Sequence, residues 1–159
     1  MSVLLRPVTE SDHDEVLALN LAEVVKLAPM DQARLLQLQG WADRFDVIEV
    51  DGHFGGFVVT VAPGTAYDSE NYAWFTERYD SFYYLDRVVL HPHVRRRGVG
   101  GRVYDELESV ASAFGRLTLE VNLDPPNDVS LAFHAGRGYA EVGRLGDEGH
   151  LVSLMSKDV

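Results

Sequence analysis

Two spacings of apolar residues alternate along the chain. Short apolar runs, alternating or continuous and rich in valine and aromatic residues, are typical of strands. The Asp51-Gly52 pair between two such runs predicts a tight hairpin turn. We therefore expect strands at residues 4–8, 45–50, 57–61, 82–90, 117–121, 139–144 and 150–155.

Apolar residues three and four positions apart predict helices between these strands. The clearest case begins at Val99, where Val103, Leu107, Val110 and Phe114 share one face. We expect helices at residues 12–27, 31–39, 99–114 and 128–137. Residues 62–81 show neither spacing, and so long an irregular connection is expected to be a functional loop. The order predicts an α/β fold with hairpins at both ends of a strand–helix–strand centre.

Composition narrows the class of protein. The chain has 159 residues, of which 46% are hydrophobic and 25% charged, which indicates one globular domain over residues 1–159. It contains no cysteine, which excludes disulfides, thiol catalysis and thiolate metal sites. Its N-terminal segment lacks the pattern of a signal peptide and no apolar run is long enough to span a membrane, so we expect a cytoplasmic location. A net charge of −11 argues against nucleic-acid and anionic-membrane partners.

Against this acidic background, four arginines gather within eight residues where a strand leads into a helix. Helix N-termini have unpaired N–H groups with partial positive charge, and glycines let a phosphate approach them closely. The segment therefore indicates a pyrophosphate site, although a solvated helix start is the plainer interpretation. The cluster and its glycines are Arg95, Arg96, Arg97, Gly98, Gly100, Gly101 and Arg102.

The run from Arg95 to Gly100 resembles the Q/R-x-x-G-x-G/A signature of the GNAT acetyltransferase superfamily. A second motif of that family is similar to the spacing of Asn127, Ser130, Phe133, Gly138 and Tyr139. Residues 121–127 with Phe133 and His134 resemble a bacterial subgroup of predicted acetyltransferases. The resemblance implies a mixed, mostly antiparallel sheet of six to seven strands with about four helices and a splayed parallel strand pair at its centre.

The same resemblance implies acetyl-CoA as cosubstrate, without a metal. Its pyrophosphate would lie on the N–H groups from about Arg96 to Gly101, and its pantetheine arm between the splayed strands. The residues expected to hold it are Val88, Val89, Leu90, Arg95, Arg96, Arg97, Gly98, Val99, Gly100, Gly101, Arg102, Asn127, Ser130 and Phe133. The pair His91 and His93 lacks a third ligand, so no metal site is expected there.

Acetyl transfer to an amine needs a group that removes a proton from the ammonium form. Asp86 and Glu120 are the acidic residues on the two central strands, and either could act directly or through water; each could instead be a paired surface carboxylate. A backbone N–H near Val89 or Leu90 would stabilise the oxyanion. Many family members carry a tyrosine as acid where this chain has His134, which could donate the proton or could pack in the core.

Half of the aromatic residues of the chain lie between Tyr67 and Tyr84, interleaved with carboxylates. This segment could be a wall around a cationic amine, or it could be a packed loop or a homodimer contact. The residues expected to bind the acceptor are Trp74, Phe75, Tyr83 and Tyr84. The acceptor could be a small amine or a peptide amine. A non-catalytic acyl-CoA-binding module is the alternative function.

Overall fold

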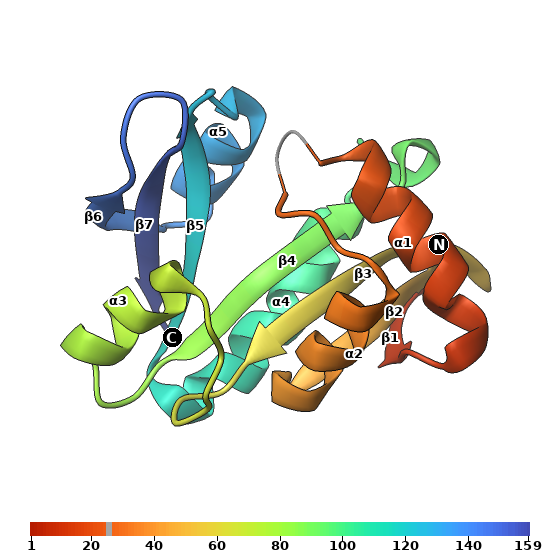
Figure 1. Cartoon of the computed structure of the whole chain (residues 1–159). Coiled ribbons are helices and arrows are strands. Elements are labelled where there is room, and N and C mark those ends of the chain that lie inside the picture. The colour runs from red at the N-terminus through yellow and green to blue at the C-terminus, as the bar shows by residue number, and fades with distance from the viewer. Residues whose placement is uncertain (25–26) are drawn as a thin grey trace.

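A seven-stranded sheet in the order β1-β2-β3-β4-β5-β7-β6 organises the chain (Figure 1). The computed structural model describes residues 1–24 and 27–159. The strands are β1 Val3–Pro7, β2 Arg44–Val50, β3 His53–Val61, β4 Tyr83–Leu90, β5 Arg116–Asp124, β6 Ala140–Leu145 and β7 Leu151–Asp158. The helices of the described residues are α1 His13–Ala22, α2 Gln32–Trp41, α3 Glu70–Arg78, α4 Val99–Ala111 and α5 Asp128–Gly136. Within this part of the chain no helix is long and apolar enough to cross a membrane.

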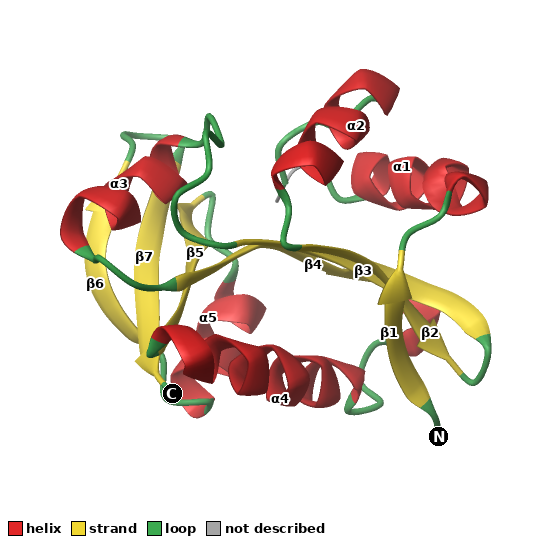
Figure 2. Cartoon of the chain, turned by 90° about the horizontal axis from the view of Figure 1, so that it is seen from below, coloured by secondary structure: helices red, strands yellow, loops and turns green. Residues whose placement is uncertain are grey.

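The helices cover the sheet from both sides, which confirms the expected fold class. Figure 2 shows α1, α2 and α3 on one face, called the α1–α3 face from here on, and α4 and α5 on the other. Side chains of β4 alternate between two apolar cores: Tyr84 packs on the α1–α3 face, while Tyr83 and Leu85 pack on the α4 face. The strand alternation is therefore what decides which side chains meet.

The segment from Ala62 to Ser81 is not irregular throughout, and that prediction was wrong. It contains α3, whose first turn is capped by the Ser69 hydroxyl accepting from the Tyr72 N–H. Tyr72 and Phe75 are buried at helical spacing, and the polar residues on either side of this pair obscured the pattern. The expected helix at 12–27 already ends at Ala22, and residues 25–26 lie outside the described residues.

The centre of the sheet opens between β4 and β5. These strands run parallel and pair only at Tyr83–Leu117 and Tyr84–Thr118. Beyond that point β4 stays with β3 as far as Leu90, while β5 stays with β7. The two strands diverge as Figure 1 shows, and we call the wedge between them the β4–β5 opening.

Candidate active site

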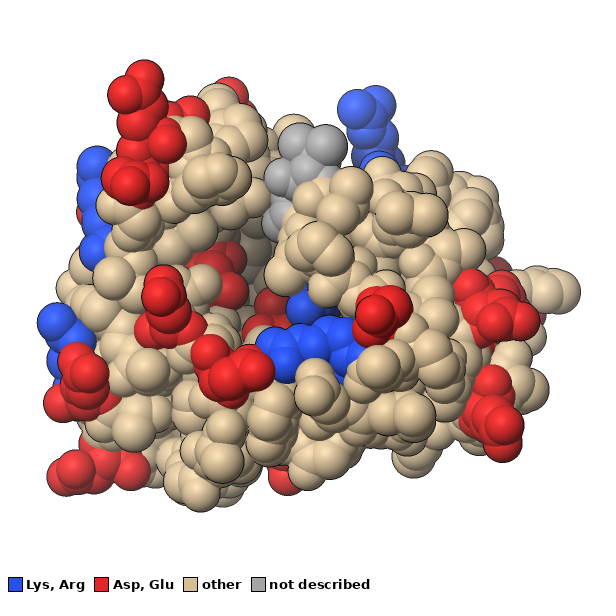
Figure 3. Space-filling view, viewed as in Figure 1, with Lys and Arg blue, Asp and Glu red and all other residues tan. Residues whose placement is uncertain are grey.

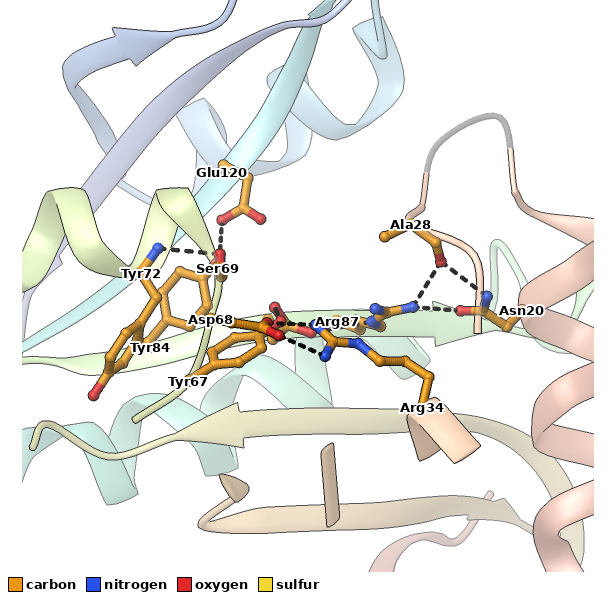
Figure 4. A network of polar contacts seen from close by, with 11 residues as sticks. Asn20, Ala28, Arg34, Tyr67, Asp68, Ser69, Tyr72, Tyr84, Arg87 and Glu120 are labelled. Atoms are coloured by element: carbon orange, nitrogen blue, oxygen red, sulfur yellow. Dashed lines mark hydrogen bonds and ion pairs between the residues drawn. The ribbon is translucent and has the colours of Figure 1, made fainter. Parts of the chain in front are cut away.

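A β-bulge in β4 places two consecutive side chains on the same face of the sheet. Val59 of β3 pairs with Arg87 while Thr60 pairs with Leu85, so Asp86 is the extra residue. Both Asp86 and Arg87 point to the α1–α3 face. The Tyr67 hydroxyl donates to Asp86 Oδ1 at 2.6 Å, and Arg87 Nη1 donates to Asn20 Oδ1 of α1 at 2.9 Å. The bulge thus builds a polar floor under this face, shown in Figure 4.

Asp86 and Arg87 neutralise each other within that floor. Arg87 Nε donates to Asp86 Oδ2 at 3.0 Å, and the Arg87 and Asp86 side chains are only 4% and 6% exposed. Arg87 Nη1 also donates to the Ala28 carbonyl at 2.8 Å. Burial and the neighbouring Asp86 charge raise the pKa of the Tyr67 hydroxyl, which therefore stays a proton donor to that carboxylate. The Asp86 carboxylate is already engaged by two donors.

Glu120 of β5 extends toward the β4–β5 opening from the opposite strand (Figure 4). The Tyr84 hydroxyl donates to Glu120 Oε2 at 2.6 Å. Burial and the nearby Asp86 charge raise the pKa of Glu120 to about 8, and the hydrogen bonds from Tyr84 and Asn71 oppose that rise. A carboxylate that titrates near neutral pH is suited to moving a proton. Of the two predicted bases, Glu120 is therefore the stronger candidate.

Only one of the four aromatic residues predicted to bind an acceptor lies beside Glu120, and it is Tyr84. Tyr83 points to the α4 face, where its hydroxyl contacts Asp43 and Thr60. Phe75 is fully buried in the core. Trp74 packs against Gly143 of β6 so closely that a side chain there would overlap the indole. The aromatic segment is therefore mainly core and helix packing.

The arginine-rich loop ends in a glycine cap on α4. Gly98 has φ 77°, a left-handed conformation that favours glycine, and a Cβ at this position would meet no atom within 4 Å. Arg95, Arg96 and Arg97 are exposed around it. The N–H groups of the first turn of α4 have no acceptor within the helix. Such N–H groups are the usual anion-binding site at a helix N-terminus. Open space, unpaired N–H groups and guanidinium groups together fit a pyrophosphate.

Some of these arginines have protein partners. Arg95 Nε donates to the Leu90 carbonyl at 3.1 Å, and its guanidinium also pairs with Glu23, the residue that follows α1. Arg97 lies 3.5 Å from Asp51. Arg102 Nη1 donates to the Met1 carbonyl at 2.7 Å. The side chain of Arg102 is thereby directed to the N-terminus of the chain.

Backbone groups of β4 face the β4–β5 opening at every second residue. The His91 N–H donates to Gly55 of β3, so Val89 also points its backbone groups toward β3. Val88 and Leu90 therefore point theirs toward β5, beyond the end of the β4–β5 pairing. A Cβ at Gly100 would lie 3.8 Å from both the Leu90 and the Phe133 side chains. Val88, Leu90 and the first turn of α4 thus share one end of the opening, with Phe133 beside it.

The second motif spans α5, from its N-cap Asn127 to the turn that follows the helix. Asn127 Oδ1 accepts from the Ser130 N–H at 3.3 Å and caps the helix. His134 lies in the core: its Nδ1 donates to the Ser130 carbonyl at 2.7 Å, and its Nε2 accepts from the Tyr104 hydroxyl at 2.7 Å. Burial lowers the pKa of His134, so the ring is neutral at pH 7. The structure does not bring His134 together with Glu120 and Asp86.

Sequence reasoning missed Asn20, Arg34 and Arg87, which together with Tyr67 of the aromatic segment complete the network in Figure 4. Arg34 of α2 donates to both carboxylate oxygens of Asp68, at 2.9 and 2.6 Å. One signal in the sequence was available, the adjacent charged residues Asp86 and Arg87 inside an apolar strand. Two adjacent side chains of a strand lie on the same face at a bulge, so this pair could have indicated the bulge.

Comparison with known proteins adds a family match. A family model described as the acetyltransferase (GNAT) family matches residues 14–139. Among solved structures, Ard1 from Thermoplasma volcanium is 19% identical with a TM-score of 0.78 over 100% of this chain and 99% of that one. The ribosomal-protein-S18-alanine N-acetyltransferase from Escherichia coli is 14% identical with a TM-score of 0.70 over 99% and 94%. Naa20 from Chaetomium thermophilum, in complex with a bisubstrate analogue, is 18% identical with a TM-score of 0.75 over 99% and 86%. At these identities the likeness shows a shared fold.

Proposed function

We propose, from the premise that this chain belongs to the GNAT acetyltransferase family, that it transfers an acetyl group from acetyl-CoA to a primary amine. The observation that carries the proposal is Glu120, a carboxylate of raised pKa, beside the β4–β5 opening. The acceptor amine would enter from the α1–α3 face, where Glu120 meets Tyr84.

The residues around the opening fit the cosubstrate. The first turn of α4 and the exposed arginines 95–97 would hold the pyrophosphate, since a side chain at Gly98 would find only open space. The backbone groups of Val88 and Leu90 would hold the arm. When bound, acetyl-CoA supplies an acetyl group activated as a thioester.

Glu120 acts on the acceptor amine in this proposal. An amine must be neutral to attack, and most primary amines are protonated near pH 7. The ionised Glu120 takes that proton, and the Tyr84 hydroxyl keeps the carboxylate in place by donating to Oε2. Asp86 contributes through its charge, which raises the pKa of Glu120, because its own oxygens are engaged by Tyr67 and Arg87.

Two further roles follow from the β4 backbone and the α5 core. The N–H of Val88 or Leu90 would donate to the acetyl carbonyl oxygen and stabilise the negative charge that develops there. The departing sulfur needs a proton, for which the sequence offers His134. Because both nitrogens of His134 are engaged, we assign it a supporting role and assign this protonation to solvent.

The proposal is tested by binding and turnover together. Acetyl-CoA and CoA are titrated into the protein while thermal unfolding is followed, with NAD and ATP as controls. A ligand at 100 times its dissociation constant adds about 2.7 kcal/mol of stability, a shift of several degrees. Saturable stabilisation by the CoA species, followed by amine-dependent release of CoA thiol, supports an acetyltransferase. Stabilisation without turnover of any amine would favour a binding module instead.

A further inference from the structure

Arg34 is a cationic side chain of the α1–α3 face whose partner is open to solvent. It lies in the first turn of α2 and donates to Asp68 Oδ1 at 2.6 Å and Oδ2 at 2.9 Å. The Asp68 side chain is 55% exposed, and it lies on the segment that precedes α3. Ion pairs at such exposed positions contribute little to stability. A carboxylate from a ligand can therefore replace Asp68 at small cost.

The Arg34 guanidinium is already oriented for such a ligand. Its central carbon lies 5.3 Å from the centre of the Trp41 ring and 5.9 Å from that of Tyr67, so two aromatic faces support it. A guanidinium binds a carboxylate through two parallel N–H bonds, which is the arrangement it makes with Asp68. The Asp68 carboxylate marks where a ligand carboxylate would lie.

The other arginine of this face cannot take that role. Arg87 is 4% exposed at its side chain, and its donors are used by Asp86, Asn20 and the Ala28 carbonyl. Removing any of these partners would leave a buried charge, which costs far more than exchanging an exposed partner. Arg87 is thus part of the floor, whereas Arg34 can bind a ligand.

Arg34 and Glu120 belong to one continuous aromatic wall. Tyr67 lies under Arg34 and donates to Asp86, and its ring centre is 6.4 Å from that of Tyr84, which donates to Glu120. Figure 4 shows these side chains side by side in space, from Glu120 to Arg34. In Figure 3, which has the view of Figure 1, the surface is hollowed between its two halves, and acidic and basic atoms meet inside the hollow. The wall thus offers a proton acceptor at one end and a cation at the other.

Arg34 also lines a second hollow, of about 300 Å³, between α1 and the start of α2. The described residues around it are mostly apolar and include Leu21, Val24, Pro29 and Met30. This hollow could receive the apolar part of a molecule whose carboxylate is held by Arg34.

We infer that Arg34 binds a carboxylate of the acceptor, so that the acceptor is an amine that also carries a carboxylate. This inference rests on the proposed acetyl transfer. Such an acceptor places its amine at Glu120 and its carboxylate at Arg34 in exchange for Asp68. The carboxylate has two sources, a free amino acid or an acidic side chain next to a peptide N-terminus, and paired acceptors distinguish them.

The test measures KM with acceptor pairs that differ only in the carboxylate. The pairs are L-methionine with L-methioninamide, and C-terminally amidated Ala-Glu with amidated Ala-Gln. Each is assayed with the unchanged protein, Arg34→Gln and Asp68→Asn. Comparing variants for one acceptor at a time cancels differences in amine basicity. Arg78→Gln is the matched control, because Arg78 also packs over an aromatic ring, that of Trp74 at 3.8 Å.

We expect Arg34→Gln to raise KM about tenfold to hundredfold for the carboxylate member of one pair, the effect of losing a charged hydrogen bond. For the other acceptor of that pair, KM should change by less than about twofold. Asp68→Asn should lower KM for the same acceptor, because it removes the competing carboxylate. A merely structural ion pair would instead make both variants worse for every acceptor, which overturns the inference. Turnover of only the two acceptors without a carboxylate, L-methioninamide and amidated Ala-Gln, also overturns the inference, while acetyl transfer itself would still stand. If no acceptor is turned over, calorimetric titration of the CoA-loaded protein decides: failure of both carboxylate members to bind overturns the inference as well.

Discussion

Tyr84 of β4 donates its phenolic hydrogen to Glu120 of β5 at 2.6 Å, and Tyr84 belongs to the last residue pair that joins these strands. The contact spans the point at which the sheet divides. It connects the strand that carries the bulge at Asp86 to the strand that carries the carboxylate of raised pKa. The α1–α3 face is therefore where the proposed proton transfer would take place, beside the β4–β5 opening.

Removing the Tyr84 hydroxyl should move the titration of Glu120 upward. The hydroxyl donates to the charged form of Glu120 and so lowers its pKa. In Tyr84→Phe the midpoint of kcat/KM against pH should therefore lie above that of the unchanged protein. Tyr83→Phe is the matched control, since the neighbouring hydroxyl contacts Asp43 and Thr60 on the other face. Equal shifts in both variants would show that the Tyr84 contact has no specific effect.

Glu120 should also make stability depend on pH. Its pKa in the folded state is raised, so the folded protein holds a proton that the unfolded chain has lost between about pH 4.5 and 8. The free energy of unfolding therefore falls as the pH rises through this window, by about 1.4 kcal/mol for each pH unit. Glu120→Gln cannot ionise, and its Tm relative to the unchanged protein should rise from pH 5 to pH 9.

The control for that measurement is Glu141→Gln on β6. Its pKa is lowered, chiefly by the Ser153 hydroxyl, so its contribution is complete above the usual carboxylate range. The Tm difference for this variant should be constant between pH 5 and 9. A constant difference for Glu120→Gln as well would contradict the raised pKa.

A carboxylate at Gly98 should block the pyrophosphate site. Gly98→Asp places negative charge in the open space at the first turn of α4. We therefore expect the affinity for acetyl-CoA to fall about tenfold to hundredfold. Gly115→Asp carries the same strain, since Gly115 has φ 84° and open space for a Cβ, but it lies beyond the other end of α4. Calorimetric titration with acetyl-CoA compares the two. Equal loss of affinity would mean that strain, not the phosphate site, is responsible.

His134 should matter for stability rather than for turnover. In His134→Phe the Tyr104 hydroxyl and the Ser130 carbonyl lose their partner in the core, which costs about 1–3 kcal/mol. Thermal unfolding should show the loss, while kcat stays within about threefold of the unchanged protein. A drop in kcat of a hundredfold at unchanged Tm would instead make His134 the proton donor.

The loop and helix at Gly98 could be read from the sequence because their signals are local. Glycine at the cap, clustered arginines and the apolar spacing from Val99 all lie within neighbouring residues. The partner of Glu120 could not be read this way. Tyr84 lies 36 residues away, and whether Tyr83 or Tyr84 meets Glu120 depends on strand register.

The bulge at Asp86 and the helix α3 escaped prediction for related reasons. One extra residue in a strand leaves its apolar content unchanged, yet it turns Asp86 and Arg87 to one face. In α3 the buried Tyr72 and Phe75 are flanked on both sides by polar residues, so the short helix resembled a loop. Both features become recognisable only through tertiary contacts.

In the proposed reaction, Glu120 receives the proton of the acceptor amine. We would measure amine-dependent release of CoA thiol between pH 6 and pH 9 for the unchanged protein and for Glu120→Gln. If Glu120 is the base, kcat/KM of the unchanged protein rises with pH toward a midpoint near 8, the pKa of Glu120. In Glu120→Gln this rise should disappear and the rate should fall about 10²–10⁴-fold. An unchanged rate and pH profile in Glu120→Gln would show that Glu120 is not the base.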